Sequence, residues 1–306
     1  MTFASGRDTC SAWYYPGSNG ACVVMATGAA ITKEPGADRF AARFQAAGFT
    51  VLSFDYRRFG DSGGTPRQVL RRREQVEDLK AAIAFAAHLS DVDADRIAAW
   101  GFSLGGGYVL EVAGKLKLAA AIAQTPFVDG PAAAPNALKH ETTGVKLRFP
   151  LIALGDTLGG LIGRPPRLIP LTGPRGSVAM LTTPDAQDGP YALDPDGRYE
   201  DWLQAIAARS VMQMGFYRPG RNAARITCPL LVVAADDDQS VLAAPAVRAA
   251  AKAPRSALLR IPGGHYAPFL EQHEPVVSTE LAFLNQHLNS VGGASTSPSP
   301  AGKGAR

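Results

Sequence analysis

The eight residues 100–107, Trp-Gly-Phe-Ser-Leu-Gly-Gly-Gly, decide the fold. Residues 96–100 predict a buried strand that leads into them, and residues 104–116 after the turn read as a helix. A Gly-x-Ser-x-Gly pattern between a strand and a helix indicates a strained turn that presents its serine at the carboxyl edge of a sheet. The flanking glycines leave room for neighbouring backbone. Ser103 is therefore the predicted nucleophile. A glycine-rich nucleotide loop is the alternative, but Gly-x-Gly-x-x-Gly and Gly-Lys-Ser/Thr are both absent here.

Working outward from this turn, strand and helix signals alternate along the chain. Such alternation is typical of a parallel sheet covered by helices, and it resumes after a long interruption. The predicted strands cover residues 22–26, 50–56, 96–100, 118–123, 229–234 and 257–261, and the predicted helices cover 38–47, 68–89, 104–116, 244–253 and 275–288.

The interruption sets the domain organisation. Residues 127–224 are rich in glycine and proline, show only short helical patches such as 199–214, and read as an inserted lid. We therefore expect residues 1–126 and 225–290 to form one catalytic core. Residues 291–306 are Gly, Ser, Pro and Ala with little to bury, which predicts a disordered tail.

Composition excludes several classes of function. The net charge of +4 is mild, and the single dense basic run at residues 71–73 is followed at once by acidic residues, so we expect no nucleic-acid partner. Three cysteines without metal-type spacing argue against a disulfide framework and a metal site. No signal pattern and no apolar run of membrane-spanning length occur, so we expect a cytoplasmic enzyme without a membrane partner, metal or cofactor. The sequence leaves open whether the chain forms a homodimer.

A serine nucleophile needs a histidine base held by an acid, in the chain order Ser, acid, His. Of five histidines, only His265 lies in a loop directly after a predicted sheet strand, and it is the predicted general base. His88, His273 and His287 lie on polar helices, and His140 lies in the insertion.

The acid should follow the strand at 229–234, where three aspartates stand in a row. Counting from the strand end favours Asp238, followed by Asp237 and then Asp236. Asp129, after the strand at 118–123, is a further candidate.

The remaining site residues concern the oxyanion and the substrate. The backbone amides of Leu104 and Ala29 are the predicted oxyanion donors, because backbone amides are already fixed in place. Small-molecule substrate contacts are predicted for Gly28, Phe102, His140, Trp202 and Tyr266. The insertion is mostly apolar and includes Trp202, so an apolar acyl or ring group would suit it.

Residues 20–125 and 226–290 resemble the α/β-hydrolase superfamily, in particular its lid-bearing esterases, lipases and acyl-peptidase-like members. Besides the Ser103 turn, residues 54–64 (FDYRRFGDSGG) are similar to the D-x-R-G-x-G-x-S segment of that family. Thr27-Gly28 replaces its usual His-Gly, which questions the geometry of the oxyanion loop. The resemblance implies a mostly parallel eight-stranded sheet with helices on both faces and an inserted lid.

Three hypotheses of function follow. The first is hydrolysis of a carboxylic ester, thioester or lactone through an acyl-Ser103 intermediate, with a peptidase as a weaker variant. The second keeps the same residues but passes the acyl group to another acceptor, as in a biosynthetic acyltransferase or cyclase. The last is an inactive scaffold used for binding. A serine at the turn argues against epoxide hydrolases and haloalkane dehalogenases, which use aspartate, and dienelactone hydrolases, which use cysteine.

Overall fold

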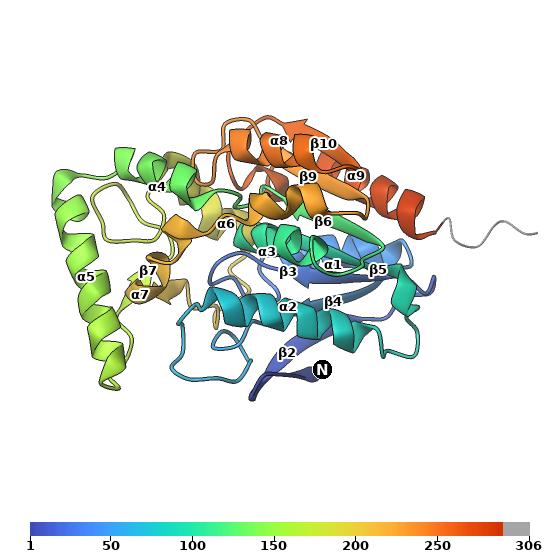
Figure 1. The fold of residues 1–306 in the computed structure, drawn as a ribbon, viewed down its shortest axis with the longest axis horizontal. Helices are drawn as coiled ribbons and strands as arrows, with labels where there is room; N and C mark the ends of the chain where they lie inside the picture. The colour runs from blue at the N-terminus through green and yellow to red at the C-terminus, as the bar shows by residue number, and fades with distance from the viewer. Residues whose placement is uncertain (290–306) are drawn as a thin grey trace, which may run out of the picture.

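The computed structural model describes residues 1–289 and centres on one eight-stranded sheet with helices on both faces (Figure 1). The strand order is β1-β2-β4-β3-β5-β6-β9-β10, and all pairs from β4 to β10 are parallel. The strands are β1 (Thr2–Ser5), β2 (Asp8–Tyr15), β3 (Cys22–Ala26), β4 (Thr50–Phe54), β5 (Ile97–Phe102), β6 (Ala120–Gln124), β9 (Leu230–Ala235) and β10 (Ser256–Ile261). The predicted tail, residues 291–306, lies outside the described residues.

Five helices cover this sheet: α1 (Ala37–Ala46), α2 (Arg72–Ala86), α3 (Leu104–Ala113), α8 (Ala243–Lys252) and α9 (His273–Leu288). Helix α2 packs on α3, and α1 packs on α9. The central strands β3, β4, β5, β6 and β9 are buried along their whole length. Continuous apolar runs form such strands because a parallel sheet is covered on both faces.

The N-terminal strands were missing from the sequence prediction, which began its first strand at residue 22. β1 and β2 form an antiparallel hairpin, and β2 pairs antiparallel with β4 at the edge of the sheet. In β2 the buried positions are the small residues Cys10 and Ala12, while Trp13 is half exposed. A strand with small inward residues carries a weak hydrophobic alternation.

The insertion, residues 127–224, contains more regular structure than the sequence predicted. It holds helices α4 (Gly130–Lys139), α5 (Thr143–Leu161), α6 (Gly189–Leu193) and α7 (Ala208–Val211), the short strands β7 (Leu168–Pro170) and β8 (Ala205–Ala207), and the 3₁₀ helix η2 (Pro184–Asp188). The predicted helical patch at 199–214 is wrong: its centre is the strand β8, paired with β7, followed by the four residues of α7. The sequence analysis did not predict the 19-residue α5, because it took glycines and prolines as helix breakers and α5 contains several glycines and an internal proline.

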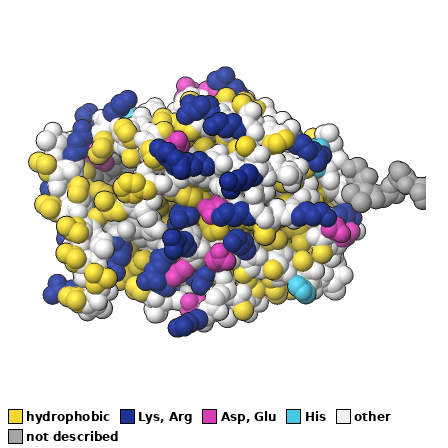
Figure 2. All heavy atoms as spheres, viewed as in Figure 1, with side chains coloured by type: hydrophobic (Ala, Val, Ile, Leu, Met, Phe, Trp, Pro, Cys, Tyr) yellow, Lys and Arg dark blue, Asp and Glu magenta, His cyan; other side chains and the backbone are white. Residues whose placement is uncertain are grey.

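The face of the molecule shown in Figure 2 carries mixed charges and scattered apolar side chains, with hydrophobic side chains gathered along the edge formed by α5. Within residues 1–289, no helix combines the length and the apolar character needed to cross a bilayer.

The carboxyl group of Glu280 lies inside the core. Glu280 of α9 is fully buried, and its Oε2 accepts a hydrogen bond of 3.1 Å from the indole nitrogen of Trp100 on β5. Its Oε1 has no hydrogen-bond partner in the described part of the chain. Burial raises the pKa of Glu280 well above its ordinary value, against the lowering effect of the Trp100 hydrogen bond. The folded state therefore holds this side chain in its neutral form.

This burial makes stability depend on pH. A raised folded-state pKa gives stability that is complete below the unfolded-state pKa and is lost as pH rises toward the folded one. Glu280→Gln removes that loss and keeps an oxygen for Trp100. We expect the difference in unfolding free energy between Glu280→Gln and the wild type to shift in favour of the variant from pH 5 to pH 8. Denaturant unfolding measures it, with Glu77→Gln on the surface of α2 as the control. A difference that is the same at both pH values would contradict a buried neutral carboxyl.

Candidate active site

The turn at Ser103 has the strained geometry that the sequence predicts. Ser103 joins β5 to α3 with φ 54° and ψ −119°, a backbone conformation that residues other than glycine rarely adopt. A Cβ on Gly101 would lie 2.5 Å from the carbonyl oxygen of Gly105, and a Cβ on Gly105 would lie 2.0 Å from that of Ala26. Only glycine fits at both positions, so the neighbouring strand and helix hold the turn in place. The side chain of Ser103 is half-buried.

Three side chains from three loops meet at this turn. The Oγ of Ser103 is 2.9 Å from Nε2 of His265, and Nδ1 of His265 is 2.8 Å from Oδ2 of Asp238. The other carboxylate oxygen of Asp238 accepts the amide of Val241 at 2.9 Å, which orients the carboxylate. Asp238 and His265 are buried. In this arrangement the histidine can take the serine proton while the aspartate holds its tautomer.

The other candidate acids point elsewhere. Asp236 pairs with Arg260 at 2.8 Å, and Asp237 accepts the amide of Gly263 at 3.3 Å. Asp129 lies 3.6 Å from Arg218. The structure thus places Asp238, the first choice from the sequence, against His265.

Burial and charge act on His265 in opposite directions. Burial lowers the pKa of its imidazole, and the charges of Asp238 and Asp185, with the Asp238 hydrogen bond, raise it to a net value above the ordinary one. A neutral imidazole is needed to accept the serine proton, so this chemistry is favoured as pH rises through the pKa of His265.

The predicted oxyanion donors belong to two segments near Ser103. The amide of Leu104 is at the first position of α3, where helix geometry provides no intrahelical acceptor. Ala29 lies on the loop after β3, and a Cβ on its neighbour Gly28 would lie 3.3 Å from the Ser103 Cβ. Thr27 stands where the family usually has histidine, and its hydroxyl donates a 2.6 Å hydrogen bond to the carbonyl of Ile31. This hydrogen bond links two positions of the same loop.

A buried carboxylate fixes the far end of this loop, the predicted oxyanion loop. Asp55, directly after β4, accepts the amide of Lys33 at 2.7 Å, its ammonium at 2.9 Å and the amide of Asp61 at 2.9 Å. Burial lowers the pKa of Lys33, but Asp55 and Asp61 outweigh it and raise the pKa, which keeps the lysine charged. The segment 54–64 singled out in the sequence therefore supports the oxyanion loop.

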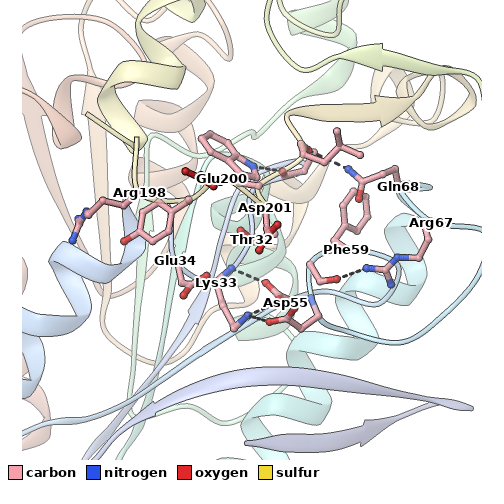
Figure 3. Close-up of a pocket in the computed structure, with 16 residues that line it drawn as sticks. Thr32, Lys33, Glu34, Asp55, Phe59, Arg67, Gln68, Arg198, Glu200 and Asp201 are labelled. Carbon is pink, nitrogen blue, oxygen red and sulfur yellow. Dashed lines mark hydrogen bonds and ion pairs between the residues drawn. The ribbon is translucent and has the colours of Figure 1, made fainter. Parts of the chain in front are cut away.

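A cavity of about 680 Å³ lies beside this loop (Figure 3). Its wall includes Lys33, Asp55 and Arg67 from the core and residues 198–203 from the insertion, so charged side chains of both signs line it beside aromatic ones. Ala30 of the oxyanion loop borders it, whereas Ser103 and His265 are not among its lining residues. The cavity therefore adjoins the candidate site at Ala30 and does not contain the side chains of Ser103 and His265.

The structure separates the predicted substrate contacts. Trp202 lines the polar cavity, and its indole donates a 2.8 Å hydrogen bond to the carbonyl of Ala30. Phe102 and Tyr266 are buried with ring centroids 5.0 Å from that of His265 and pack around the base. His140 lines another cavity, of about 340 Å³, together with Arg175 and other insertion residues.

Sequence reasoning missed Asp185, a buried residue of η2 in the insertion. Its Oδ2 accepts backbone amides from Gln239 at 2.8 Å, His265 at 3.2 Å and Ser240 at 3.3 Å, and its Oδ1 accepts the Ser240 hydroxyl at 2.9 Å. It thus joins the loop of the acid to the loop of the base. Burial opposes its charge, but hydrogen bonds and the proximity of His265 lower its pKa below the ordinary value. Nothing in the local sequence around residue 185 signals this contact, which spans 80 residues.

The described residues contain no group of three or more His, Cys, Asp or Glu side chains arranged to hold a metal ion. Cys10, Cys22 and Cys228 are buried free thiols. The chemistry that the described side chains can perform is therefore nucleophilic attack by Ser103 with proton transfer through His265.

The model of the alpha/beta hydrolase family matches residues 23–279, and this chain belongs to that family. The predicted fold class is confirmed by this match and by the observed sheet. Quorum-quenching protein AidA of Acinetobacter baumannii is 38% identical over 291 residues, 94% of each chain. Polyketide transferase ATR5 of Stachybotrys chlorohalonatus is 30% identical over 75% of this chain and 76% of its own length.

Solved structures are similar in fold at lower identity. The alpha/beta hydrolase GrgF from a Penicillium species superposes with a TM-score of 0.77 at 23% identity, covering 94% of this chain and 98% of that chain. DcsB, solved with a substrate analogue, superposes with a TM-score of 0.79 at 20% identity over the same shares. These likenesses show the fold.

The position of Asp185 generates a prediction about His265. Asp185→Asn removes a negative charge beside the imidazole, so we expect the pKa of His265 to fall relative to the wild type. We also expect the variant to lose about 1–3 kcal/mol of unfolding free energy, because its charged hydrogen bonds become neutral ones. NMR titration of the His265 ring, assigned by its absence in His265→Gln, measures the first effect and denaturant unfolding measures the second.

Asp194→Asn is the matched control. Asp194 also lies in the insertion and accepts two backbone amides, those of Arg198 and Tyr199, away from the triad loops. We expect this change to leave the His265 titration where it is. An unchanged His265 titration in Asp185→Asn would show that Asp185 has no electrostatic influence on the base.

Proposed function

We propose that the chain is a serine hydrolase that cleaves a carboxylic ester, thioester or lactone of a mostly apolar small molecule. The observation that carries this proposal is the continuous hydrogen-bonded series from Ser103 Oγ through His265 to Asp238, with links of 2.9 and 2.8 Å. Its position at a strained turn on the carboxyl edge of the sheet supports the same role.

In the first half-reaction, Ser103 Oγ attacks the carbonyl carbon while its proton moves to Nε2 of His265. The carbonyl oxygen becomes an oxyanion, and the amides of Leu104 and Ala29 donate hydrogen bonds to it. The bond from the carbonyl carbon to the leaving oxygen or sulfur then breaks, and Nε2 gives its proton to that atom. The acyl group is left as an ester of Ser103. Asp238 stabilises the imidazolium formed on the way.

In the second half-reaction, water gives a proton to Nε2 of His265 and its oxygen attacks the acyl-Ser103 carbon. The same amides bind the second oxyanion. The bond from the acyl carbon to Ser103 Oγ breaks, Oγ recovers the proton from Nε2, and a carboxylic acid leaves. With a lactone substrate the alcohol stays attached, so the product is one ring-opened hydroxy acid.

The insertion is proposed to act as a lid, and its contacts support this role. Trp202 reaches the oxyanion loop at Ala30, and Asp185 reaches the backbone of His265. Just before α4, the amide of Phe127 donates to the carbonyl of Ser103 at 2.8 Å, and its half-buried ring stacks on Tyr217 with centroids 6.2 Å apart. We assign the Phe127 ring to an apolar wall for the acyl group.

Acyl transfer to an acceptor other than water is a second candidate function. Relatives named polyketide transferases match 54–75% of this chain at 30–34% identity, and one relative is named a thiohydrolase. The names of the relatives therefore include both group transfer and hydrolysis. The triad chemistry is the same up to the acyl-Ser103 stage. The two functions differ only in the nucleophile that attacks that ester.

The nucleophile assignment is tested by covalent labelling. We expect a fluorophosphonate probe to label the wild type, and Ser103→Ala to abolish labelling and to reduce p-nitrophenyl ester hydrolysis about 10³-fold or more. Mass spectrometry locates the label. Ser177→Ala, which changes a half-buried serine of the insertion, should label like the wild type. Retained labelling in Ser103→Ala would overturn the assignment.

Product analysis distinguishes hydrolysis from acyl transfer to another acceptor. With a panel of p-nitrophenyl esters, thioesters and lactones of graded chain length, we expect the free acid as the main product in water. Adding millimolar alcohols or amines should leave the acid as the main product, because the concentration of water is about 10⁴-fold higher than theirs. Only a site that binds the alcohol or amine would change this ratio. Ester or amide products that dominate at these concentrations would favour the transferase. Chromatography of the products gives the ratio.

A further inference from the structure

The polar cavity in Figure 3 has no part in the chemistry proposed for Ser103. Its volume is about 680 Å³, and it lies between the core and the insertion. Residues from the segments 30–34, 55–61 and 67–68 form its core side, and residues 198–203 form its insertion side. A space of this size accommodates a small organic molecule. The charges and hydrogen-bonding groups of its wall indicate which kind of molecule fits.

The core side of the cavity is electrically balanced. The ammonium of Lys33 lies 2.9 Å from a carboxylate oxygen of Asp55 and 2.6 Å from one of Asp61. The guanidinium of Arg67 donates to two backbone carbonyls in the segment 60–62. Burial lowers the pKa of Arg67, and the charges of Asp55 and Asp61 oppose this effect. Two cations thus face two carboxylates, and this side offers no unpaired charge to a ligand.

The insertion side carries negative charge that has no partner. Glu200 and Asp201 are exposed and line the cavity, and neither carboxylate has a hydrogen bond or an ion pair within residues 1–289. The guanidinium of Arg198 lies 3.1 Å from Asp38 and 3.6 Å from Asp196. Both of these aspartates lie outside the cavity wall, so Arg198 does not neutralise the two free carboxylates. The cavity therefore has an excess of negative charge.

Two buried polar side chains add acceptors to the same cavity. Gln68 is 7% exposed and Thr32 is 9% exposed, and both line the wall. The amide nitrogen of Gln68 donates to the carbonyls of Leu203 at 3.2 Å and Ala205 at 2.7 Å. This arrangement leaves Oε1 of Gln68 without a donor in the described part of the chain, and the Thr32 hydroxyl has no partner there either. Buried oxygens of this kind indicate a ligand that donates hydrogen bonds.

We propose that the polar cavity binds an organic cation, with a primary ammonium group on an apolar stem. The two free carboxylates of the insertion attract the charge, and the oxygens of Gln68 and Thr32 accept the N–H groups. The buried rings of Phe59 and Trp202 provide apolar surface for the stem, and aromatic faces also attract cations. A neutral polyol would leave the two carboxylates unpaired, and a carboxylate ligand would meet charge of its own sign.

The cation site lies beside the predicted oxyanion loop and is separate from the nucleophile. Ala30 borders the cavity with φ 54°, and its carbonyl accepts the indole N–H of Trp202 at 2.8 Å. A bound cation would therefore lie against the contact that joins the insertion to this loop. Ser103 and His265 do not line the cavity. Binding of the cation consequently does not require the chemistry proposed for Ser103.

The ligand class is tested by calorimetric titration of the full-length chain at pH 7. We expect benzylammonium to bind one per chain, and the neutral isostere benzyl alcohol and the anion benzoate to bind at least ten-fold more weakly. The three probes share their ring, so the difference reports on the charged group. The affinity for benzylammonium should fall as salt rises, because the two carboxylates are exposed. No binding of benzylammonium, or equal or tighter binding of either isostere, would overturn the proposal.

Substitution of the two carboxylates tests the location. We expect Glu200→Gln/Asp201→Asn to bind benzylammonium about ten-fold more weakly, since one exposed ion pair contributes up to about five-fold. Circular dichroism should show the variant folded, because both side chains are exposed. Asp188→Asn, at an exposed carboxylate of the insertion outside the cavity, is the matched control and should bind like the wild type. Unchanged affinity in the double variant would show that the cation does not bind here.

Ser103→Ala separates this site from the proposed active site. We expect this variant to bind benzylammonium with the affinity of the wild type, whatever its effect on ester hydrolysis. The cation site could then exist even if Ser103 were not the nucleophile, and the two proposals fail independently. Loss of binding in Ser103→Ala would place the cation at the nucleophile and overturn a separate site.

Discussion

The backbone at Ser103 is strained, and the surrounding structure is what holds it there. Strand β5 must end, reverse and enter α3 within a few residues, and it does so against the carbonyl oxygens of Ala26 and Gly105. Strain of this kind persists only where neighbouring elements leave no alternative. The buried parallel strands β3 and β5 supply that constraint, because their pairing fixes the distance between the turn and the oxyanion loop. The position of the nucleophile is thus a consequence of the core.

The insertion contributes to the same framework from the other side. Asp185 bonds to the backbone of the loops that carry Asp238 and His265, and Trp202 bonds to the oxyanion loop at Ala30. Asp55 also holds that loop, because it accepts hydrogen bonds from the amide and the ammonium of Lys33. The loops that carry Asp238, His265 and Ala30 are therefore fixed by buried polar groups from other parts of the chain. Buried carboxylates are stable in these places because every one has several hydrogen-bond donors.

The core and the triad side chains could be predicted because their signals are local. Gly-x-Ser-x-Gly between a strand and a helix located Ser103, and the ends of later strands located Asp238 and His265, which the structure brings into contact. The β1–β2 hairpin was missed because its inward residues are small, and α5 was missed because it contains glycines and a proline. Asp185 could not be predicted, since its partners are 54 to 80 residues away and depend on how the insertion folds back.

The contacts of Asp185 bear on how this member of the alpha/beta hydrolase family can be engineered or can diverge. Insertions between β6 and β9 look like replaceable modules, since they leave the sheet at one point and return at another. Here the module carries Asp185, which bonds to both loops of the candidate catalytic centre, so a chimera that exchanges residues 127–224 as a block would also remove this brace between the loops of Asp238 and His265. Recombination that preserves residues 183–189 together with the loops at 236–241 and 263–266 would keep that brace. The breakpoints for a functional hybrid therefore lie inside the insertion and not at its ends.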